Sequence, residues 1–198
     1  MRTKDHALLA RWLLAREPAK LPHGFAAGVC LGSVLPDWNP VTYMRGGHGL
    51  HGHNAEITEG RICRLLSDLQ KPLAFGFSDG LRLGTALHYL ADSFTYPHHA
   101  YYLGSLADHV AYETSLHRTF ADYLEKDCVF PRTTTADFPA YFADMLTRYR
   151  QCRKDERTDC RFITQMCDLA FATVLHSQEK EKVLYESPDY DRSVPAVR

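Results

Sequence analysis

The sequence predicts an all-α protein, a single-domain bundle of about seven helices spanning residues 1–198. Apolar residues recur at helical spacing along nearly the whole chain, and no two segments show the alternation that is typical of paired strands. Apolar residues make up 45% of the chain and charged residues 24%, which is ordinary for a folded domain. A chain of 198 residues is also long enough to bury one sizeable core.

The N-terminal part of the chain contains three of these helices. Residues 4–16 repeat apolar side chains at helical spacing and end at the segment EPAKLP. Residues 23–36 form a short apolar helix that is expected to end at Pro36, and its glycines and alanines suit close packing. The loop that follows is rich in Pro, Gly and Asn. Asn54 then caps a third helix that runs to about Gln70.

Four more helices are expected in the remainder of the chain. One covers about 79–95 and stops before a proline, because the residue that precedes a proline disfavours helical geometry. The next covers about 105–126. Asp137 caps a sixth helix, and the last helix runs from roughly 157 to 182. The tail, residues 185–198, is expected to be loose.

Charge and composition disfavour several classes of protein. The formal net charge is −1, so no overall field favours nucleic acid or an anionic membrane. Charged residues interrupt the N-terminal stretch MRTKDHALLARWLLAREPAK, which therefore predicts neither a signal peptide nor a membrane anchor. No other run approaches the roughly 20 apolar residues of a spanning helix. The six cysteines form no CxxC pair, which favours free thiols in a reducing compartment, and we expect a cytoplasmic protein.

Ionisable side chains of the kind that bind metals are concentrated in the segment LHYLADSFTYPHHAYYLGSLADHVAYE, residues 87–113. His88 and Asp92 are four residues apart on one predicted helix, so both project from the same face. His109 and Glu113 have the same spacing on the next helix. Either pair alone is also compatible with a surface ion pair or a hydrogen bond in the core.

The second pair is expected to point toward the core. It shares its helix face with a line of apolar residues, namely Leu106, Val110, Leu116, Phe120 and Leu124. A buried carboxylate without a partner is costly or loses its charge, and a cation compensates it best. Imidazole nitrogen and carboxylate oxygen are ligands that suit zinc. Two such pairs on consecutive helices therefore predict a metal site.

Further candidate ligands lie upstream. His6 is on an inward face of the first helix, and Asp37 follows the break at LPD, where a carboxylate in a loop can point back into the bundle. The loop GGHGLHGHN offers three histidines. We prefer His53 to His51 and His48, because it directly precedes the cap of the third helix while glycines surround the other two.

At these positions the chain resembles the zinc-dependent phospholipase C and S1/P1 nuclease superfamily. The signature of that superfamily is a helix with HxxxD, a histidine six residues after the aspartate, and HxxxE on the next helix. The segments LGTALHYLADSFTYPH and HVAYE supply all five positions: His88, Asp92, His98, His109 and Glu113. This spacing selects His98 over His99, and we expect His99 and His117 to lie outside the ligand set. Upstream, GSVLPD supplies Asp37 and the first helix supplies His6, so the match covers about residues 6–125.

The resemblance implies a cluster of zinc ions. The first ion would be held by Asp37, the loop histidine, His88 and Asp92. The second would be held by His98, His109 and Glu113, and the third by His6 and a bridging Asp92. Secreted members also bind the third ion through an N-terminal tryptophan, whereas this chain begins MRTKDH, so either two or three zinc ions are expected. Met1 is five residues before His6, close enough to fold back toward the site.

The reaction that the resemblance implies is phosphoester hydrolysis by a metal-bound hydroxide, with Asp37 as both ligand and catalytic base. The preferred substrate is a phospholipid headgroup or a small phosphodiester of the choline or ethanolamine type, and aromatic residues such as Trp38 can cage a quaternary ammonium. Two alternatives are an S1/P1-like nuclease or nucleotidase, and a zinc-binding protein without catalysis. Nucleic acid is less favoured, because acidic residues interrupt the only basic stretch, residues 148–161. The oligomeric state is not indicated.

Overall fold

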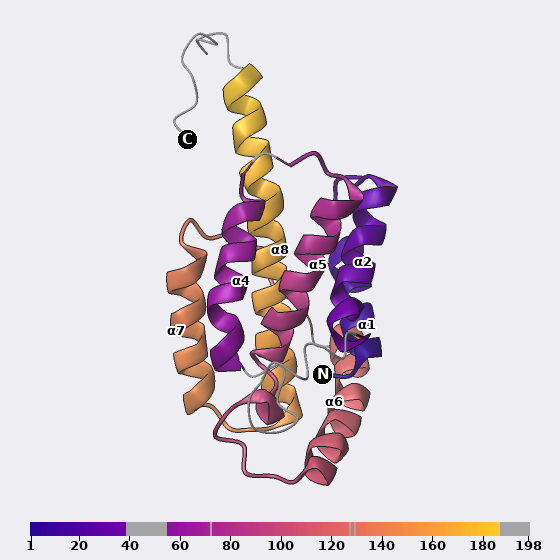
Figure 1. Ribbon diagram of the computed structural model, residues 1–198, viewed down its shortest axis with the longest axis vertical. Coiled ribbons are helices and arrows are strands. Elements are labelled where there is room, and N and C mark those ends of the chain that lie inside the picture. Colours follow the sequence, from indigo (N-terminus) through magenta and orange to yellow (C-terminus); the bar gives the residue numbers. More distant parts are fainter. Residues whose placement is uncertain (39–54, 72, 127, 129, 187–198) are drawn as a thin grey trace.

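The computed structural model describes residues 1–38, 55–71, 73–126, 128 and 130–186, and every regular element in this part of the chain is helical (Figure 1). The elements are α1 (Thr3–Ala15), α2 (His23–Trp38), α4 (Ala55–Leu69), α5 (Phe77–Asp92), the 3₁₀ turn η1 (Tyr96–His98), α6 (Leu106–Lys126), α7 (Phe138–Gln151) and α8 (Glu156–Glu186). The predicted all-α class is therefore confirmed, with seven α-helices among the described residues.

Most helix boundaries agree with the prediction to within a few residues. Asp137 caps α7 as expected, because its carboxylate accepts a hydrogen bond of 3.0 Å from the N–H of Ala140. α5 ends at Asp92, three residues earlier than expected, and the chain then passes into η1. α8 continues to Glu186, beyond the expected end at 182, so the predicted loose tail 185–198 begins inside a helix and otherwise lies outside the described residues.

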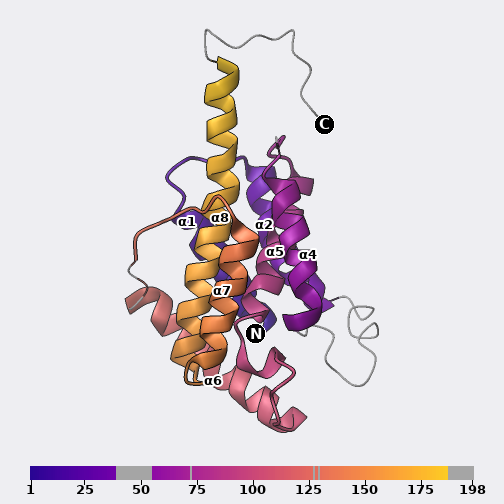
Figure 2. The ribbon, with the colours of Figure 1, turned by 90° about the vertical axis from the view of Figure 1, so that its left-hand side faces the viewer.

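α5 is the central helix of the bundle. It packs against α2 on one side and against α4 and α8 on the other (Figures 1 and 2). Every residue of its C-terminal part from Leu87 to Asp92 is buried. The side chains of His88 and Asp92 are therefore held in the interior and shielded from bulk water.

Glycines allow α2 and α5 to approach each other at backbone distance. The facing glycines are Gly28, Gly32, Gly80 and Gly84. A Cβ atom added to Gly84 would lie only 2.2 Å from the carbonyl oxygen of Val29, so no larger residue fits without separating the helices. The close packing that the small residues of 23–36 predict is thus observed, and it brings the last turn of α2 beside His88.

Asp37 lies in the last turn of α2, so the predicted position in a loop after Pro36 is wrong. A proline lacks an N–H, which leaves the carbonyl four residues earlier without its helical donor. Here that carbonyl belongs to Gly32, and the hydroxyl of Thr85 on α5 lies 3.5 Å from its oxygen. That hydroxyl donates its single hydrogen to the carbonyl oxygen of Leu81 at 2.8 Å, so its contact with Gly32 is weak. α2, which packs closely on α5, nevertheless continues for two residues past the proline.

α6 follows its predicted pattern only in its second half. Leu116 and Phe120 are buried, but Leu106 and Val110 are 59% and 52% exposed, so the expectation that they face the core is wrong. The cause is length, because the 21 residues of α6 extend beyond the helices that it packs against, α1 and α8 (Figure 1). His109 lies at the boundary between the covered and the uncovered part of this face.

All six cysteines are free, which confirms the absence of a disulfide framework. Cys128, Cys160 and Cys167 are buried. None of the described helices combines the length and the apolar character that a membrane crossing would require.

Candidate metal centre

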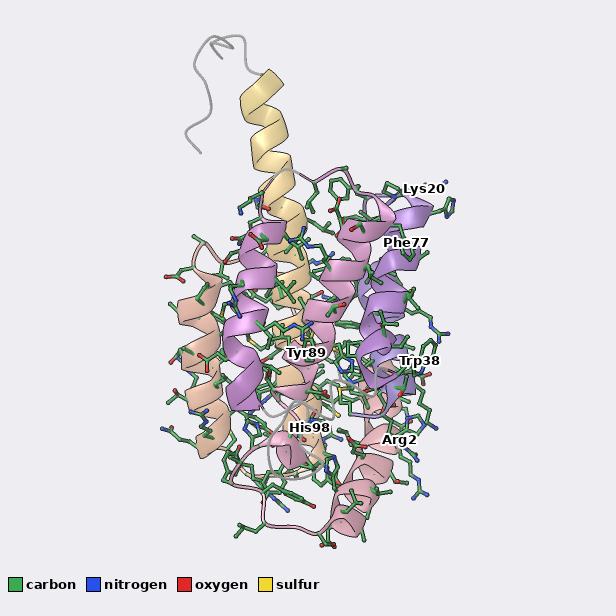
Figure 3. The ribbon with its side chains drawn as sticks, in the orientation of Figure 1. Arg2, Lys20, Trp38, Phe77, Tyr89 and His98 are labelled. Atoms are coloured by element: carbon green, nitrogen blue, oxygen red, sulfur yellow. The ribbon has the colours of Figure 1, made fainter. Side chains whose placement is uncertain are left out.

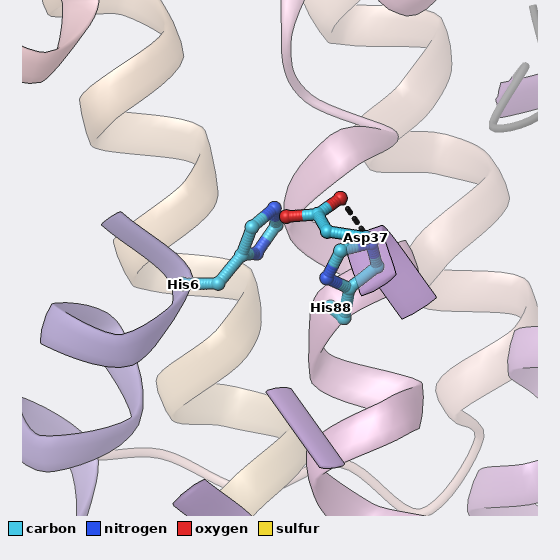
Figure 4. A group of neighbouring side chains, drawn as sticks. All are labelled: His6, Asp37 and His88. Carbon is cyan, nitrogen blue, oxygen red and sulfur yellow. Dashed lines mark ion pairs between the residues drawn. The ribbon is translucent and has the colours of Figure 1, made fainter. Parts of the chain in front are cut away.

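Three candidate ligands from three helices meet in the interior: His6 on α1, Asp37 on α2 and His88 on α5 (Figure 4). One ligand atom from each residue lies within 4.8 Å of the other two. The rings of His6 and His88 are stacked with centroids 3.9 Å apart, and His88 Nε2 is 3.7 Å from Asp37 Oδ1. We call these three residues the inner group.

A hydrogen bond to α2 sets the orientation of the His88 ring. Its Nδ1 lies 2.9 Å from the carbonyl oxygen of Ser33. Because a carbonyl oxygen can only accept, Nδ1 carries the proton, and the lone pair of Nε2 is directed at Asp37 and Asp92. A histidine whose second nitrogen is fixed in this way is typical of metal sites.

The inner group has the properties of a cation site. Both ring nitrogens of His6 and Oδ2 of Asp37 are buried without a hydrogen bond in the part of the chain that the structure describes. Such atoms are rare in folded proteins. A neutral imidazole has one lone pair, so a cation here would engage one nitrogen of His6 together with Oδ2 of Asp37. Asp37 also lies at the C-terminal end of α2, where the helix dipole adds negative potential. The residues present therefore fit zinc, which binds imidazole and carboxylate in this combination.

A second set of ligands, the outer group, consists of His98 on η1 and His109 and Glu113 on α6. Nε2 of each histidine lies 3.2 Å from Oε1 of Glu113. These side chains are 11% to 19% exposed, whereas the histidines of the inner group are fully buried. Figure 3 places His98 in the half of the molecule that is remote from Phe77, the first residue of α5. Solvent therefore reaches the centre from the side of the outer group.

Asp92 lies between the two groups. Its Oδ2 is 3.4 Å from His88 Nε2 and 3.7 Å from His98 Nδ1, while its Oδ1 is 3.3 Å from His6 Nε2. Burial acts to raise the pKa of this carboxyl, but its electrostatic interactions with His98, the Met1 amine and His6 outweigh burial and hold the pKa well below its ordinary value. The buried carboxylate stays ionised because its surroundings are rich in cationic groups.

The amine of Met1 reaches the same place, so the chain does fold back as its proximity to His6 allows. The nitrogen lies 2.9 Å from Asp92 Oδ1, 3.1 Å from Glu113 Oε1 and 3.1 Å from His98 Nε2. Burial acts to lower the pKa of the amine, but the two carboxylates raise it to about 11. The space between the inner and outer groups thus favours positive charge.

The structure groups the predicted ligands differently in one respect. His6 lies with Asp37 and His88, rather than with Asp92 alone at a separate third site. It nevertheless keeps its contact with Asp92 through Nε2. The number of zinc ions and the ligand role of each residue stay predictions.

The remaining histidines of the motif region lie outside both groups or outside the described residues. His99 is buried and its ring stacks on Tyr101, so the choice of His98 from the spacing agrees with the geometry. The preferred loop ligand His53 and its alternatives His51 and His48 fall in 39–54, outside the described residues.

Sequence reasoning missed the buried acid Asp5, which directly precedes His6. Asp5 on α1 is fully buried and pairs with His117 on α6, so it ties together the helices that carry His6 and Glu113. The only signal in the sequence is that Asp5 directly precedes His6 in the first turn of the helix. Its burial depends on the covering by α6, which local spacing does not encode.

One known protein family matches this chain over most of its length. The model of the family described as zinc dependent phospholipase C matches residues 5–177. The chain belongs to the zinc-dependent phospholipase C family. The matched range contains both ligand groups and Asp92, so family membership agrees with the donor set. Searches of curated proteins and of solved structures found no match.

Proposed function

We propose that this member of the zinc-dependent phospholipase C family is a phosphoester hydrolase that acts on a phospholipid headgroup or a small phosphodiester of the choline or ethanolamine type. The observation that carries the proposal is the arrangement of two histidine and carboxylate groups around the buried Asp92, one of them partly exposed to solvent. A more deeply buried inner group and a partly exposed outer group suit a centre that must hold ions firmly and still admit a substrate.

In this proposal the residues of the inner group would hold one zinc ion, those of the outer group would hold another, and Asp92 lies within reach of both. The loop histidine, for which His53 is preferred, would complete the inner set. Zinc held in this way lowers the pKa of a coordinated water toward neutrality and offsets the charge of the phosphate. A third ion, bound through His6 and Asp92, is the alternative stoichiometry.

Asp37 is the candidate for the catalytic base. Its side chain is 12% exposed, and its Oδ2 has no hydrogen bond among the described residues. Because the side chain is partly exposed, the carboxylate oxygen that does not bind the ion could accept a hydrogen bond from a water molecule, orient that water and take its proton. His88 lies 3.7 Å from Asp37, and the carbonyl oxygen of Ser33 fixes the orientation of its ring. Asp37 therefore has a neighbour whose position is fixed.

Two observations favour a small phosphodiester over nucleic acid. Trp38 follows Asp37 directly and is 64% exposed, so its ring is available to a quaternary ammonium group. The basic stretch 148–161 does not form a strip of free cations, because Arg148 pairs with Asp144 and Arg153 pairs with Asp155. A cytoplasmic location stays a prediction.

A panel of substrates on zinc-loaded protein tests the proposal. We expect hydrolysis of p-nitrophenyl phosphorylcholine and of phosphatidylcholine vesicles, and little cleavage of single-stranded DNA. Cleavage of DNA alone would replace the proposal with the nuclease alternative. Full zinc occupancy without turnover of any substrate would leave the non-catalytic alternative.

The Asp37→Asn variant tests the role of the base. Loss of a positioned general base should lower the rate about 100-fold or more. Asp144→Asn, on the exposed face of α7, removes the same charge far from the centre and serves as the control. Zinc content is measured on the same samples, and a fully loaded Asp37→Asn variant with the wild-type rate would contradict the assignment.

A further inference from the structure

A carboxylate that the proposed chemistry does not use lies close behind the outer group. Asp159, near the start of α8, is fully buried and accepts three hydrogen bonds. Its Oδ2 accepts from the backbone N–H of Tyr96 at 3.0 Å and from the hydroxyl of Tyr112 at 2.8 Å. Its Oδ1 accepts from the hydroxyl of Tyr149 at 2.6 Å. Three donors on one buried acid are more than the packing of α8 alone requires.

Two of these donors belong to the elements that carry the outer group. Tyr96 is the first residue of η1, whose last residue is His98. Tyr112 directly precedes Glu113 on α6 and follows His109 by three residues. The same oxygen of Asp159 therefore holds both η1 and α6, whereas α8 itself supplies no candidate ligand.

The element that carries His98 depends on such a contact. η1 is a single 3₁₀ turn of three residues, too short to hold its own geometry, and the chain between η1 and α6 contains no regular element. His98 and His109 nevertheless lie at equal distances from one Glu113 oxygen, 3.2 Å each. A contact that joins η1 to α6, such as the one through Asp159, fixes how far His98 lies from His109 and Glu113.

We propose that Asp159 is a positioning residue, which sets the spacing between His98 on η1 and the His109 and Glu113 pair on α6. The inference rests on the metal-binding function proposed above, and it assigns a role to a residue that contacts none of the candidate ligands. Partners of metal ligands that fix their orientation typically affect metal affinity by roughly 10- to 100-fold. We expect an effect of this size at the outer group and no direct effect at the inner group.

The third donor provides an internal control. Tyr149 lies on α7, which carries no candidate ligand, and its hydroxyl donates to the same carboxylate. Tyr149 is fully buried and Tyr112 is only partly buried. If Asp159 served stability alone, Tyr149→Phe would be at least as harmful as Tyr112→Phe in every measurement. If Asp159 positions the outer group, the order for metal affinity is reversed.

The experiment is a titration of the metal-free full chain with Co²⁺, whose visible absorption reports the number and geometry of its ligands. The binding step that Glu113→Gln weakens identifies the ion of the outer group. At that step we expect Tyr112→Phe to bind about 10-fold more weakly with a changed absorption band, and Asp159→Asn to lose roughly 10- to 100-fold. Tyr149→Phe should keep the wild-type affinity and band, while urea unfolding of the same samples measures the stability of each variant.

The outcomes separate the two levels of the argument. Equal Co²⁺ affinity in Tyr112→Phe and in wild type, or equal losses in Tyr112→Phe and Tyr149→Phe, would overturn the positioning role and leave the metal site intact. A wild-type chain that takes up no Co²⁺ and no zinc would overturn the proposed function and this inference with it. Because Tyr112→Phe removes one hydroxyl from a partly exposed ring, it keeps the test valid even if Asp159→Asn does not fold.

Discussion

Replacing Gly84 by alanine is expected to separate α5 from α2 and thereby to disturb the inner group. The added Cβ would lie 2.2 Å from the carbonyl oxygen of Val29 and 2.8 Å from the backbone nitrogen of Ser33. Both are backbone atoms of α2, so no side-chain rotation relieves the contact. Since non-bonded atoms prefer a separation of roughly 3.5 Å, the helix axes must move apart by about 1 Å.

The expected cost follows from two opposing terms. Overpacking in a core typically costs about 1–3 kcal/mol, and contacts with backbone belong at the upper end of that range. Alanine gains about 0.5–1 kcal/mol over glycine inside a helix. The free energy of unfolding should therefore fall by about 2 kcal/mol. A shift of α2 by about 1 Å would also lengthen the 2.9 Å hydrogen bond between Ser33 and His88 beyond bonding distance, so zinc affinity should fall as well.

The assay is urea unfolding of the metal-free protein, followed by zinc titration of the same variant. Gly60→Ala on α4 is the matched control, because an added Cβ there meets no atom within 4 Å. The control should be as stable as the wild type or more stable by up to about 1 kcal/mol. If Gly84→Ala matches this control in both stability and zinc affinity, the close approach of α2 and α5 does not support the site as we argue.

Three further predictions concern metal content and charge. Elemental analysis should find two or three zinc ions per chain, and less than one metal ion even after zinc is added would contradict the metal centre. Glu113→Gln should lose more zinc affinity than His99→Gln, because the amide removes the charge that offsets the cation; equal affinities would refute the outer group. Burial raises the pKa of Asp159 to about 6 against the lowering effect of its hydrogen bonds, so its contribution to stability is present below about pH 4 and is lost as the pH rises through 6. Relative to Asp159→Asn, the wild type should lose up to about 3 kcal/mol of unfolding free energy between pH 4 and 7, and parallel pH profiles would contradict this.

Local spacing predicted the parts of the site that local geometry determines. His88 with Asp92, and His109 with Glu113, share a helix face because residues four apart must do so. The placement of His6 against His88 depends on how α1 packs on α5, and spacing along the chain carries no such information. Helical periodicity also shows which residues share a face, but not how far a neighbour covers that face, which is why Val110 was expected inside and lies exposed.

The proline rule and the interpretation of Asp159 failed where contacts with distant parts of the chain decide the outcome. Pro36 was expected to end its helix, but α2 packs at backbone distance on α5, which lies more than 40 residues away in the sequence, and α2 continues for two residues beyond the proline. Asp159 was interpreted as one of the acidic residues that interrupt a basic stretch, because its three donors come from distant parts of the chain. Contacts of this kind require the assembled bundle and have no local signature.

The two buried carboxylates near the centre show how the environment distinguishes a ligand from a support. Both Asp92 and Asp159 lose the solvation of water, which acts to raise the pKa of each. Around Asp92 the compensation comes from cationic groups, and its pKa is held well below the ordinary value. Around Asp159 it comes from neutral N–H and O–H donors, and the pKa stays raised at about 6. A carboxylate that nearby positive charge stabilises is suited to bind a metal ion. A carboxylate that directed hydrogen bonds stabilise instead fixes the positions of the segments that donate those bonds. The same residue type therefore serves as a candidate ligand in one case and as a support for the ligands in the other.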